Sequence, residues 1–377
     1  MWKTSSVLIG IVLLLTTLGV IMLASASPAS SASPLQDPFV LRQAGALLVG
    51  LIAATVVART DYHRWRTLAV PIALVAAVLL LLVLVPGVGR TVKGSQRWLP
   101  LGPLSVQPSE VAKLALVLLM GWWMSRVQRR AESLVQGLIV PLVMMGVMIG
   151  LVFKEPDFGT TMLMGTVGMA IMFAGGARIS YLLTAGALGF SAISLAIMQN
   201  AERMRRIIAF LNPDQFAQDE AFQLLNAIYA FVVGGRLGVG LGGSLQKRHY
   251  LPEAHTDFIF AIVGEELGLV ASLLVLALFL GLFVCGLRIS YRAMDSFGRL
   301  VAFGITAMIT LQAAINIGVV TGCLPTKGLP LPFMSYGGTS LTVTLVMVGI
   351  LVNIALQAGG EHADDNIPVI KDRARHL

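Results

Sequence analysis

Residues 251–287 read LPEAHTDFIFAIVGEELGLVASLLVLALFLGLFVCGL, an apolar run with acidic residues at its start and just inside it. Five ionisable residues fall within fourteen positions: Glu253, His255, Asp257, Glu265 and Glu266. A charged side chain at membrane depth costs about 2.5–3.5 kcal/mol on insertion scales. Acids in such a run therefore face a wet cavity, pair with a partner or take part in chemistry.

The composition places the chain among polytopic membrane proteins. Its 377 residues are 56% hydrophobic and 12% charged, and the mean hydropathy is +0.83, far outside the soluble range. The net charge of +8 fits basic anchors on the cytoplasmic side, and nothing resembles a nucleic-acid-binding module. Apolar stretches of about 20 residues predict an all-α fold with ten transmembrane helices. They are residues 6–26, 41–58, 67–86, 109–125, 133–153, 159–176, 179–199, 257–286, 300–321 and 339–357.

Ten spans place both termini on one side of the membrane, and the basic residues indicate which side. With the N-terminus inside, fourteen of the 27 Lys and Arg residues are cytoplasmic, and six of the other thirteen belong to one long outer loop. Because the positive-inside rule applies to short loops, this distribution predicts cytoplasmic termini. The predicted organisation is one transmembrane domain, residues 1–357, with a large extracytoplasmic loop at 200–256 and a cytoplasmic tail at 358–377.

Asp257 lies at the outer mouth of the eighth predicted helix. A helix that starts there places Ala261, Gly264 and Gly268 on nearly the same side as Asp257. That face then consists of small residues and carries a carboxylate at its outer end. On one interpretation the glycines pack against another helix, and the acid only interacts with the helix dipole. On the other, Asp257 does chemistry, because desolvation near a helix end raises the basicity of a carboxylate and makes it a candidate general base.

The loop before the fourth predicted helix carries several charges. Pro108 and Ser109 favour a helix start, and Glu110 and Lys113 then share one face at a spacing of three. The pair is either a salt bridge at a helix start or a cavity site in which Glu110 positions Lys113 for a pyrophosphate or sugar. For Arg97, lipid-headgroup anchoring and bidentate phosphate contact both remain open.

Four other outer segments have recognisable patterns. Asp157 is placed to cap the sixth predicted helix. Residues 202–206 begin a basic amphipathic segment typical of an interfacial helix. Residues 234–243 hold six glycines with no preceding strand, which favours a flexible or backbone-close turn over a dinucleotide fingerprint. Residues 324–332, which include Lys327, hold three prolines, so they are not a continuous helix and must line water or be buried in protein.

Four motifs together resemble the SEDS family of peptidoglycan polymerases. They are Arg97-Trp98 with Gln107 to Lys113, Glu155-Pro156-Asp157-Phe158-Gly159-Thr160, Leu251 to Phe258, and Pro325 to Gly328 with Ser335 to Gly338. The resemblance spans about residues 5–357 and is closer to the cell-division branch of the family than to its elongation branch. It implies a ten-helix glycosyltransferase that polymerises lipid II at the outer face of the cytoplasmic membrane during septal wall synthesis.

The resemblance also implies site residues. Asp257 matches the essential aspartate of the family, and Glu110 and Lys113 match its paired cavity residues. The predicted substrate-binding residues are Arg97, Glu110, Lys113, Asp157, His255 and Lys327. Positive charge is needed where pyrophosphate charge develops, for which Arg97, Lys113 and Lys327 are the candidates. No metal-ligand cluster is recognisable, and a divalent cation such as Mg²⁺ could share that role.

The implied partners are lipid II, the growing glycan strand and a cognate class B penicillin-binding protein, an FtsI-like transpeptidase that crosslinks the strands. Other division proteins such as FtsQ, FtsL and FtsB are further expected partners. A lipid II flippase would use the same lipid and cavity, and a non-catalytic division scaffold would need no positioned base. Formation of glycan chains from lipid II distinguishes the enzyme from both alternatives.

Overall fold

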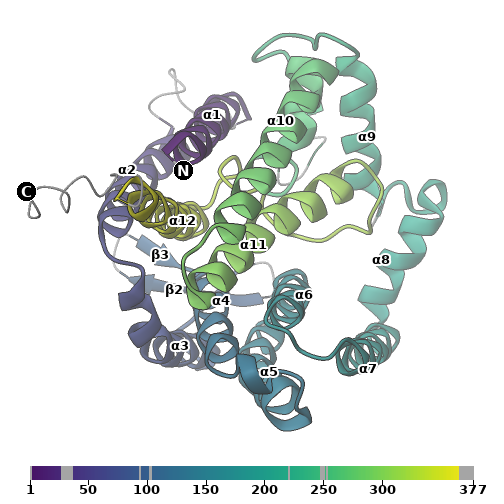
Figure 1. The fold of residues 1–377 in the computed structure, drawn as a ribbon. Coiled ribbons are helices and arrows are strands. Elements are labelled where there is room, and N and C mark those ends of the chain that lie inside the picture. The colour runs from purple at the N-terminus through teal and green to yellow at the C-terminus, as the bar shows by residue number, and fades with distance from the viewer. Residues whose placement is uncertain are drawn as a thin grey trace, which may run out of the picture.

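The computed structural model describes residues 2–26, 37–92, 95–101, 104–219, 221–246, 251 and 254–364. Glu253 lies outside the described residues. Within them the chain forms a helical bundle with a small sheet (Figure 1). The α-helices are α1 (Trp2–Ala26), α2 (Pro38–Arg59), α3 (His63–Leu84), α4 (Pro108–Arg126), α5 (Val140–Lys154), α6 (Phe158–Ala174), α7 (Ile179–Met198), α8 (Ala201–Leu211), α9 (Phe222–Gly234), α10 (Ile259–Tyr291), α11 (Ser296–Val320) and α12 (Gly338–Asp364).

Each predicted span coincides with a helix in the structure. The stretch 133–153 is a π-helical turn, η3 (Leu134–Ile139), followed by α5. Eight of the described helices are long and apolar enough to cross a membrane. The other two predicted spans are the 17-residue α6 and the helix α4, whose first turns carry Glu110 and Lys113. The fold is therefore that of a multi-pass helical membrane protein.

The predicted large loop contains two helices of its own. The amphipathic segment at 202–206 begins α8, which confirms the predicted interfacial helix as a helix. A 3₁₀ turn, η4 (Pro213–Phe216), connects α8 to α9, and a second 3₁₀ turn, η2 (Gln128–Arg130), follows α4. The sequence analysis missed α9, because a helix of 13 residues is too short to span a bilayer.

The first outer loop folds into a three-stranded antiparallel sheet in the order β1-β2-β3. The strands are β1 (Arg90–Val92), β2 (Ser95–Leu101) and β3 (Leu104–Val106). Trp98 lies opposite Arg90, and Leu99 lies opposite Val106. The all-α prediction describes the bundle correctly but missed this sheet, because strands of three to seven residues give too short an alternation to recognise.

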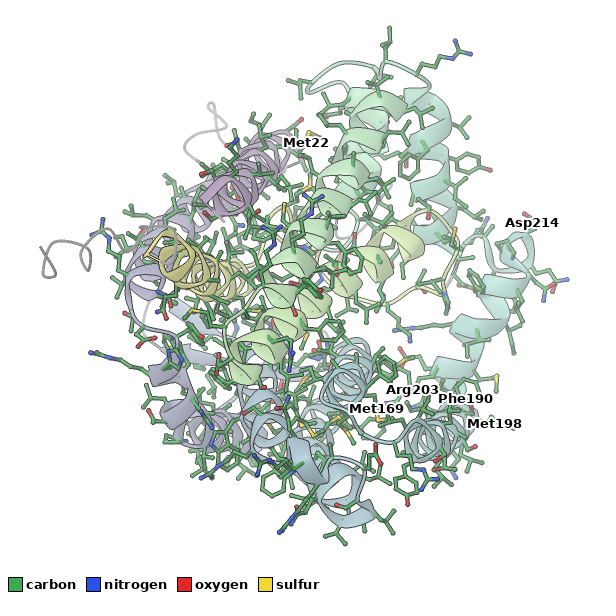
Figure 2. The ribbon with its side chains drawn as sticks, in the orientation of Figure 1. Met22, Met169, Phe190, Met198, Arg203 and Asp214 are labelled. Atoms are coloured by element: carbon green, nitrogen blue, oxygen red, sulfur yellow. The ribbon has the colours of Figure 1, made fainter. Side chains whose placement is uncertain are left out.

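Helices α11 and α12 lie at the centre of the bundle. In their most apolar windows 61% and 72% of the residues are buried, compared with 6% in α7. Helix α12 packs along α2, and α11 packs along α10. Phe190 and Met198 of α7 are exposed at the edge of the molecule (Figure 2). An apolar helix that buries so little against protein is suited to contact with lipid.

Helix α10 bends at Gly268, whose φ is 76° and ψ is −170°. The glycine-rich residues 234–243 run against this bend, and the Val239 N–H donates to the Glu265 carbonyl over 3.0 Å. A Cβ atom on Gly268 would overlap the backbone nitrogen of Gly238, which also has a positive φ. The predicted close approach of backbones in this segment is confirmed.

The predicted glycine packing is right at one position and wrong at the other. A Cβ atom on Gly264 would overlap the ring of Phe231 in α9, so Gly264 does allow two helices to meet. Gly268 interrupts its helix and packs against the backbone of the loop at Arg236 and Gly238 instead of against a second helix. Helix α10 also begins at Ile259, and Asp257 lies in the turn before it rather than on its first turn.

The two inner acids of the opening motif have a structural role. Glu265 and Glu266 are fully buried. The Glu265 carboxylate accepts hydrogen bonds from the Ser244 hydroxyl and, over 2.9 Å, from the Leu245 N–H. The Glu266 carboxylate accepts from the Ser25 hydroxyl over 2.6 Å. These bonds satisfy the buried acids, and they hold α1 and the segment that follows the glycine-rich residues 234–243 against α10.

The connections between helices gather at two ends of the bundle. Those that precede α4, α6, α10 and α12 contribute to one cavity. At the other ends of the helices, the Tyr62 hydroxyl donates to Asp295 over 2.7 Å, and the Ser296 hydroxyl donates to Gln128 over 2.8 Å. Successive connections thus lie at opposite ends of the bundle, as they do when successive spans run in opposite directions.

Candidate functional site

A cavity of about 800 Å³ brings distant polar segments together. Five of the seven predicted site residues line it: Arg97, Glu110, Asp157, Asp257 and Lys327. They come from β2, α4, the start of α6, the turn before α10 and the proline-containing segment before α12. Lys113 and His255 are not among the described lining residues.

Asp257 is half-buried at the cavity wall. Its backbone carbonyl accepts a hydrogen bond from the buried Asn316 amide over 2.8 Å, and the same amide donates to the Leu329 carbonyl over 2.7 Å. Gly328 lies against the Asp257 side chain, since a Cβ atom there would be 2.8 Å from Oδ2. Asn316 of α11 therefore holds the proline-containing segment and the aspartate together, and a glycine leaves room for the carboxylate.

Glu110 and Lys113 form an ion pair beneath the cavity. Lys113 Nζ lies 2.7 Å from Glu110 Oε2, and both side chains are buried. Lys113 also donates to the Gln312 carbonyl oxygen over 2.7 Å, and the Gln312 amide donates to the Pro330 carbonyl over 2.8 Å. The predicted pair is confirmed, but Lys113 supports the cavity wall instead of lining the cavity.

Arg97 connects the outer sheet to the turn between α5 and α6. Its guanidinium donates to the carbonyls of Glu155 and Pro156 over 2.9 and 2.6 Å. Asp157 caps α6 by accepting from the backbone N–H and the hydroxyl of Thr160 over 3.1 and 3.0 Å. The capping role predicted for Asp157 is confirmed. The hydrogen bonds of Arg97 go to neutral backbone carbonyls, and its guanidinium forms no ion pair with a described carboxylate.

Lys327 is a second cation in the cavity wall without a described carboxylate partner. Its ammonium lies 4.9 Å from the centroid of the Phe158 ring and 2.8 Å from the Met162 sulfur. Arg203 of α8, labelled in Figure 2, lies 5.2 Å from the same ring centroid. Burial lowers the pKa of Lys327. A partly desolvated cation beside an aromatic ring, in the wall of a cavity, is well placed to bind an anionic group.

His255 packs away from the cavity. Its ring centroid is 5.2 Å from that of Phe39 and 6.0 Å from that of Tyr336. Its backbone carbonyl accepts from the Tyr336 N–H over 2.9 Å. The described contacts of His255 thus join α2 to the segment before α12. His255 is not among the described lining residues, whereas Tyr336, which it contacts, does line the cavity.

Glu155 is an acid that sequence reasoning did not select. It is fully buried, and neither carboxyl oxygen has a hydrogen-bond partner in the described chain. Burial and then the charge of Asp157 raise the pKa of Glu155 to about 8, against the opposing charge of Arg97. The carboxyl is therefore mainly neutral at pH 7.

Glu155→Gln is expected to keep polymerising activity at pH 7 within about threefold, because the amide matches the shape of a neutral acid. The folded-state pKa lies above the ordinary value of 4.5, so stability falls as pH rises from about 4.5 to about 8. The Gln variant lacks this loss. Its melting temperature in detergent should exceed that of the wild type increasingly between pH 5 and pH 8. Parallel melting profiles would contradict a buried neutral acid.

The large loop predicted at 200–256 contributes a wall of the cavity that the sequence did not predict. Five lining residues come from α8, from the segment before α9 and from the first turn of α9: Arg206, Gln218, Asp219, Phe222 and Gln223. The basic pattern around Arg206 was visible in the sequence, but it was assigned to the membrane surface. The other four residues could not be predicted as lining residues from the sequence, because polar residues in a loop are usually solvated.

The described residues contain no group of three or more His, Cys, Asp or Glu side chains that could hold a metal ion. Of the carboxylates that line the cavity, Glu110 is paired with Lys113 and Asp157 caps α6. Among the described residues, Arg97 and Lys327 line the cavity without a carboxylate partner.

Comparison with known proteins gives a consistent family. The profile of the cell cycle proteins FtsW, RodA and SpoVE matches residues 5–359. A protein of Trichlorobacter lovleyi named "Probable peptidoglycan glycosyltransferase FtsW" is 41% identical over 351 residues, which cover 93% of this chain and 92% of that protein. Among solved structures, the chain is similar to one in a peptidoglycan synthase complex that coordinates polymerization and crosslinking, with a TM-score of 0.77, 27% identity and coverage of 95% and 98%. It is also similar to RodA of Thermus thermophilus, with a TM-score of 0.69, 27% identity and coverage of 93% and 96%.

Proposed function

The chain belongs to the FtsW, RodA and SpoVE family of cell cycle proteins, and we propose that it polymerises lipid II into glycan strands for the septal wall. It is a peptidoglycan glycosyltransferase, as its FtsW relatives are named. One observation carries the proposal: Asp257 lines one cavity together with Arg97 and Lys327, two cations that have no carboxylate partner among the described residues. A base and positive charge are the two things that this transfer requires.

The reaction joins two sugars with inversion. The C4 hydroxyl of an acceptor GlcNAc attacks the anomeric carbon of the MurNAc that ends the growing strand. Asp257 accepts the hydroxyl proton as general base. The bond from the anomeric carbon to the pyrophosphate oxygen breaks, undecaprenyl pyrophosphate leaves, and the new linkage is β. Arg97 and Lys327 stabilise the charge that develops on the leaving group.

The protein lies in the cytoplasmic (inner) membrane at the division septum, with ten spans and both termini in the cytoplasm. The short-loop charge distribution supports this orientation. The gathering of alternate connections around one cavity supports the ten-span arrangement, with α4 and α6 as the two shorter or more polar spans. The cavity then opens to the extracytoplasmic side, where the polymer is made.

Single cysteines at positions 97 and 327 are expected to react with an impermeant thiol reagent added outside intact cells. The background lacks Cys285 and Cys323, the two free cysteines. A cysteine at position 129, an exposed residue on the opposite side of the predicted topology, is the matched control and should react only after permeabilisation. Bound lipid II should protect positions 97 and 327. Reaction of those two from the cytoplasmic side alone would overturn the orientation.

A crosslinking partner completes the proposed assembly. A structurally similar chain belongs to a complex that coordinates polymerization and crosslinking. By analogy, this chain pairs with a class B penicillin-binding protein, an FtsI-like transpeptidase that acts on the strands the polymerase makes. FtsQ, FtsL and FtsB are further proposed division partners.

The test of the function is strand synthesis from lipid II by the purified protein, alone and with its transpeptidase partner. The expected product is a ladder of glycan chains that a muramidase digests. A protein that moves lipid II across liposomes without forming chains would be a flippase. A protein that does neither, with or without the partner, would be a scaffold.

A further inference from the structure

The cavity has a second wall of a different chemical character from its charged wall. Gln218, Asp219, Phe222 and Gln223 line it from the segment that leads from η4 into α9. Figure 1 shows α8 and α9 on the side of the bundle away from α2 and α3. One cavity therefore reaches from the sheet strand with Arg97 to this outer segment.

The side chains of this second wall are not engaged in the described fold. Gln218, Asp219 and Gln223 make no side-chain hydrogen bond or ion pair with another described residue, and the Phe222 ring stacks on no described aromatic ring. Phe222 and Gln223 are half-buried, whereas Gln218 and Asp219 are exposed. Two side-chain amides, one carboxylate and one aromatic ring thus line the cavity, and no described residue binds the polar groups or stacks on the ring.

The charge of this wall does not suit a phosphate group. Its one lining cation, Arg206, lies 2.7 Å from Glu202, so that its charge is already matched. Asp219 leaves the wall with a net negative charge. Phosphate recognition requires unmatched positive charge, which the cavity offers at Arg97 and Lys327 instead.

The wall does suit a pyranose ring. Vicinal hydroxyls donate to carboxylates, and both hydroxyls and an acetamide can donate to and accept from amides. The C–H face of a pyranose can lie on an aromatic ring such as Phe222. The volume of about 800 Å³ is also larger than a pyrophosphate alone requires.

We propose that Gln218, Asp219, Phe222 and Gln223 form a sugar-binding subsite that holds a pyranose ring of the glycan while Arg97 and Lys327 hold the pyrophosphate. This inference rests on the proposed function. It adds the division of the cavity into a neutral-sugar part and an anion-binding part. The subsite fixes the sugar whose hydroxyl or anomeric carbon must reach Asp257.

Asp219→Asn, Phe222→Leu and Gln223→Ala are the test variants. Each is expected to raise the KM for lipid II about tenfold with kcat within about twofold, because Asp219→Asn and Gln223→Ala weaken a hydrogen bond to the sugar and Phe222→Leu removes the ring that contacts its C–H face. Gln215→Ala is the matched control, since Gln215 is exposed in the same segment and does not line the cavity. Variants that behave like Gln215→Ala would overturn the subsite.

Two inhibitors separate the two parts of the cavity. Soluble GlcNAc–MurNAc disaccharide should inhibit the subsite variants about tenfold less than the wild type, whereas inorganic pyrophosphate should inhibit them equally. Lys327→Met should show the reverse pattern. Equal loss of both inhibitions in the subsite variants would indicate general distortion and refute the assignment. With a preformed undecaprenyl-linked tetrasaccharide as donor, the substrate whose KM rises identifies the sugar that the subsite holds.

Direct binding keeps the two proposals separable. Binding of the disaccharide to the full-length protein in detergent is measured by saturation-transfer NMR, without turnover. A wild type that polymerises lipid II, with binding unchanged in the variants, refutes the subsite and leaves the function standing. A wild type that binds the disaccharide through these residues but forms no strands refutes the function and leaves the subsite standing.

Discussion

Asp257→Asn is expected to lower glycan polymerisation by about 10² to 10⁴-fold, the range that general base catalysis supplies. Asn keeps the shape of the side chain and loses only its basicity. The backbone at Asp257 is held by Asn316, and Gly328 leaves room beside the side chain, so the substitution should not disturb the cavity. The measurement is strand synthesis by purified protein, with lipid II binding and partner binding determined in parallel.

Asp214→Asn is the matched control. Asp214 lies at the outer edge of the molecule in Figure 2, is exposed, and does not line the cavity. It should polymerise as the wild type does. An Asp257→Asn protein within a few-fold of wild type would remove Asp257 from the role of base. A loss of lipid II binding equal to the loss of activity would assign Asp257 to substrate binding.

Lys113→Met is expected to destabilise the protein by about 3–5 kcal/mol and to lower polymerisation, because it leaves the buried Glu110 carboxylate without its cation. It also removes the hydrogen bond to Gln312, which connects this pair to the Pro330 carbonyl. The cavity segment that carries Lys327 should then lose part of its support. Thermal unfolding in detergent and strand synthesis measure the two effects.

The double variant Glu110→Gln/Lys113→Met tests whether the two residues act as a unit. Its losses should be no greater than those of the poorer single variant, since no buried charge remains. The exposed Glu202–Arg206 pair is the stability control, and Glu202→Gln should cost under about 1 kcal/mol. Independent losses that multiply in the double variant would contradict a functional pair.

The membrane helices were predictable because the bilayer imposes a simple rule. A span needs about 20 apolar residues, and stretches of that length are visible in a sequence without any knowledge of tertiary contacts. The amphipathic start of α8 and the non-helical segment around Lys327 were predictable for equally local reasons, which are charge pattern and proline geometry. Helix α9 was missed because a short apolar helix in a loop satisfies no such rule.

Side-chain directions were less predictable than helices. Lys113 was expected to line the cavity, but one turn of helix beneath Glu110 carries it under the wall to Gln312. His255 is two residues from Asp257, yet its ring lies against Phe39 and Tyr336. Neighbours in an irregular turn can face opposite ways, and which way each faces depends on segments that pack there from far along the chain.

The sequence by itself determined that this chain is a multi-pass membrane protein, that its acids and outer cations need a wet or paired environment, and that its motifs are those of a SEDS polymerase. The first two conclusions rest on composition, local spacing and the cost of burying charge, and the third rests on the resemblance of four motifs to a known family. Only the tertiary structure decided which acids are structural: Glu265 is bound by Leu245 after the glycine-rich stretch and Glu266 by Ser25 of α1, whereas Asp257 lines a cavity. That distinction depends on contacts between segments distant in the sequence, because a buried polar group takes its role from the partners that the fold brings to it.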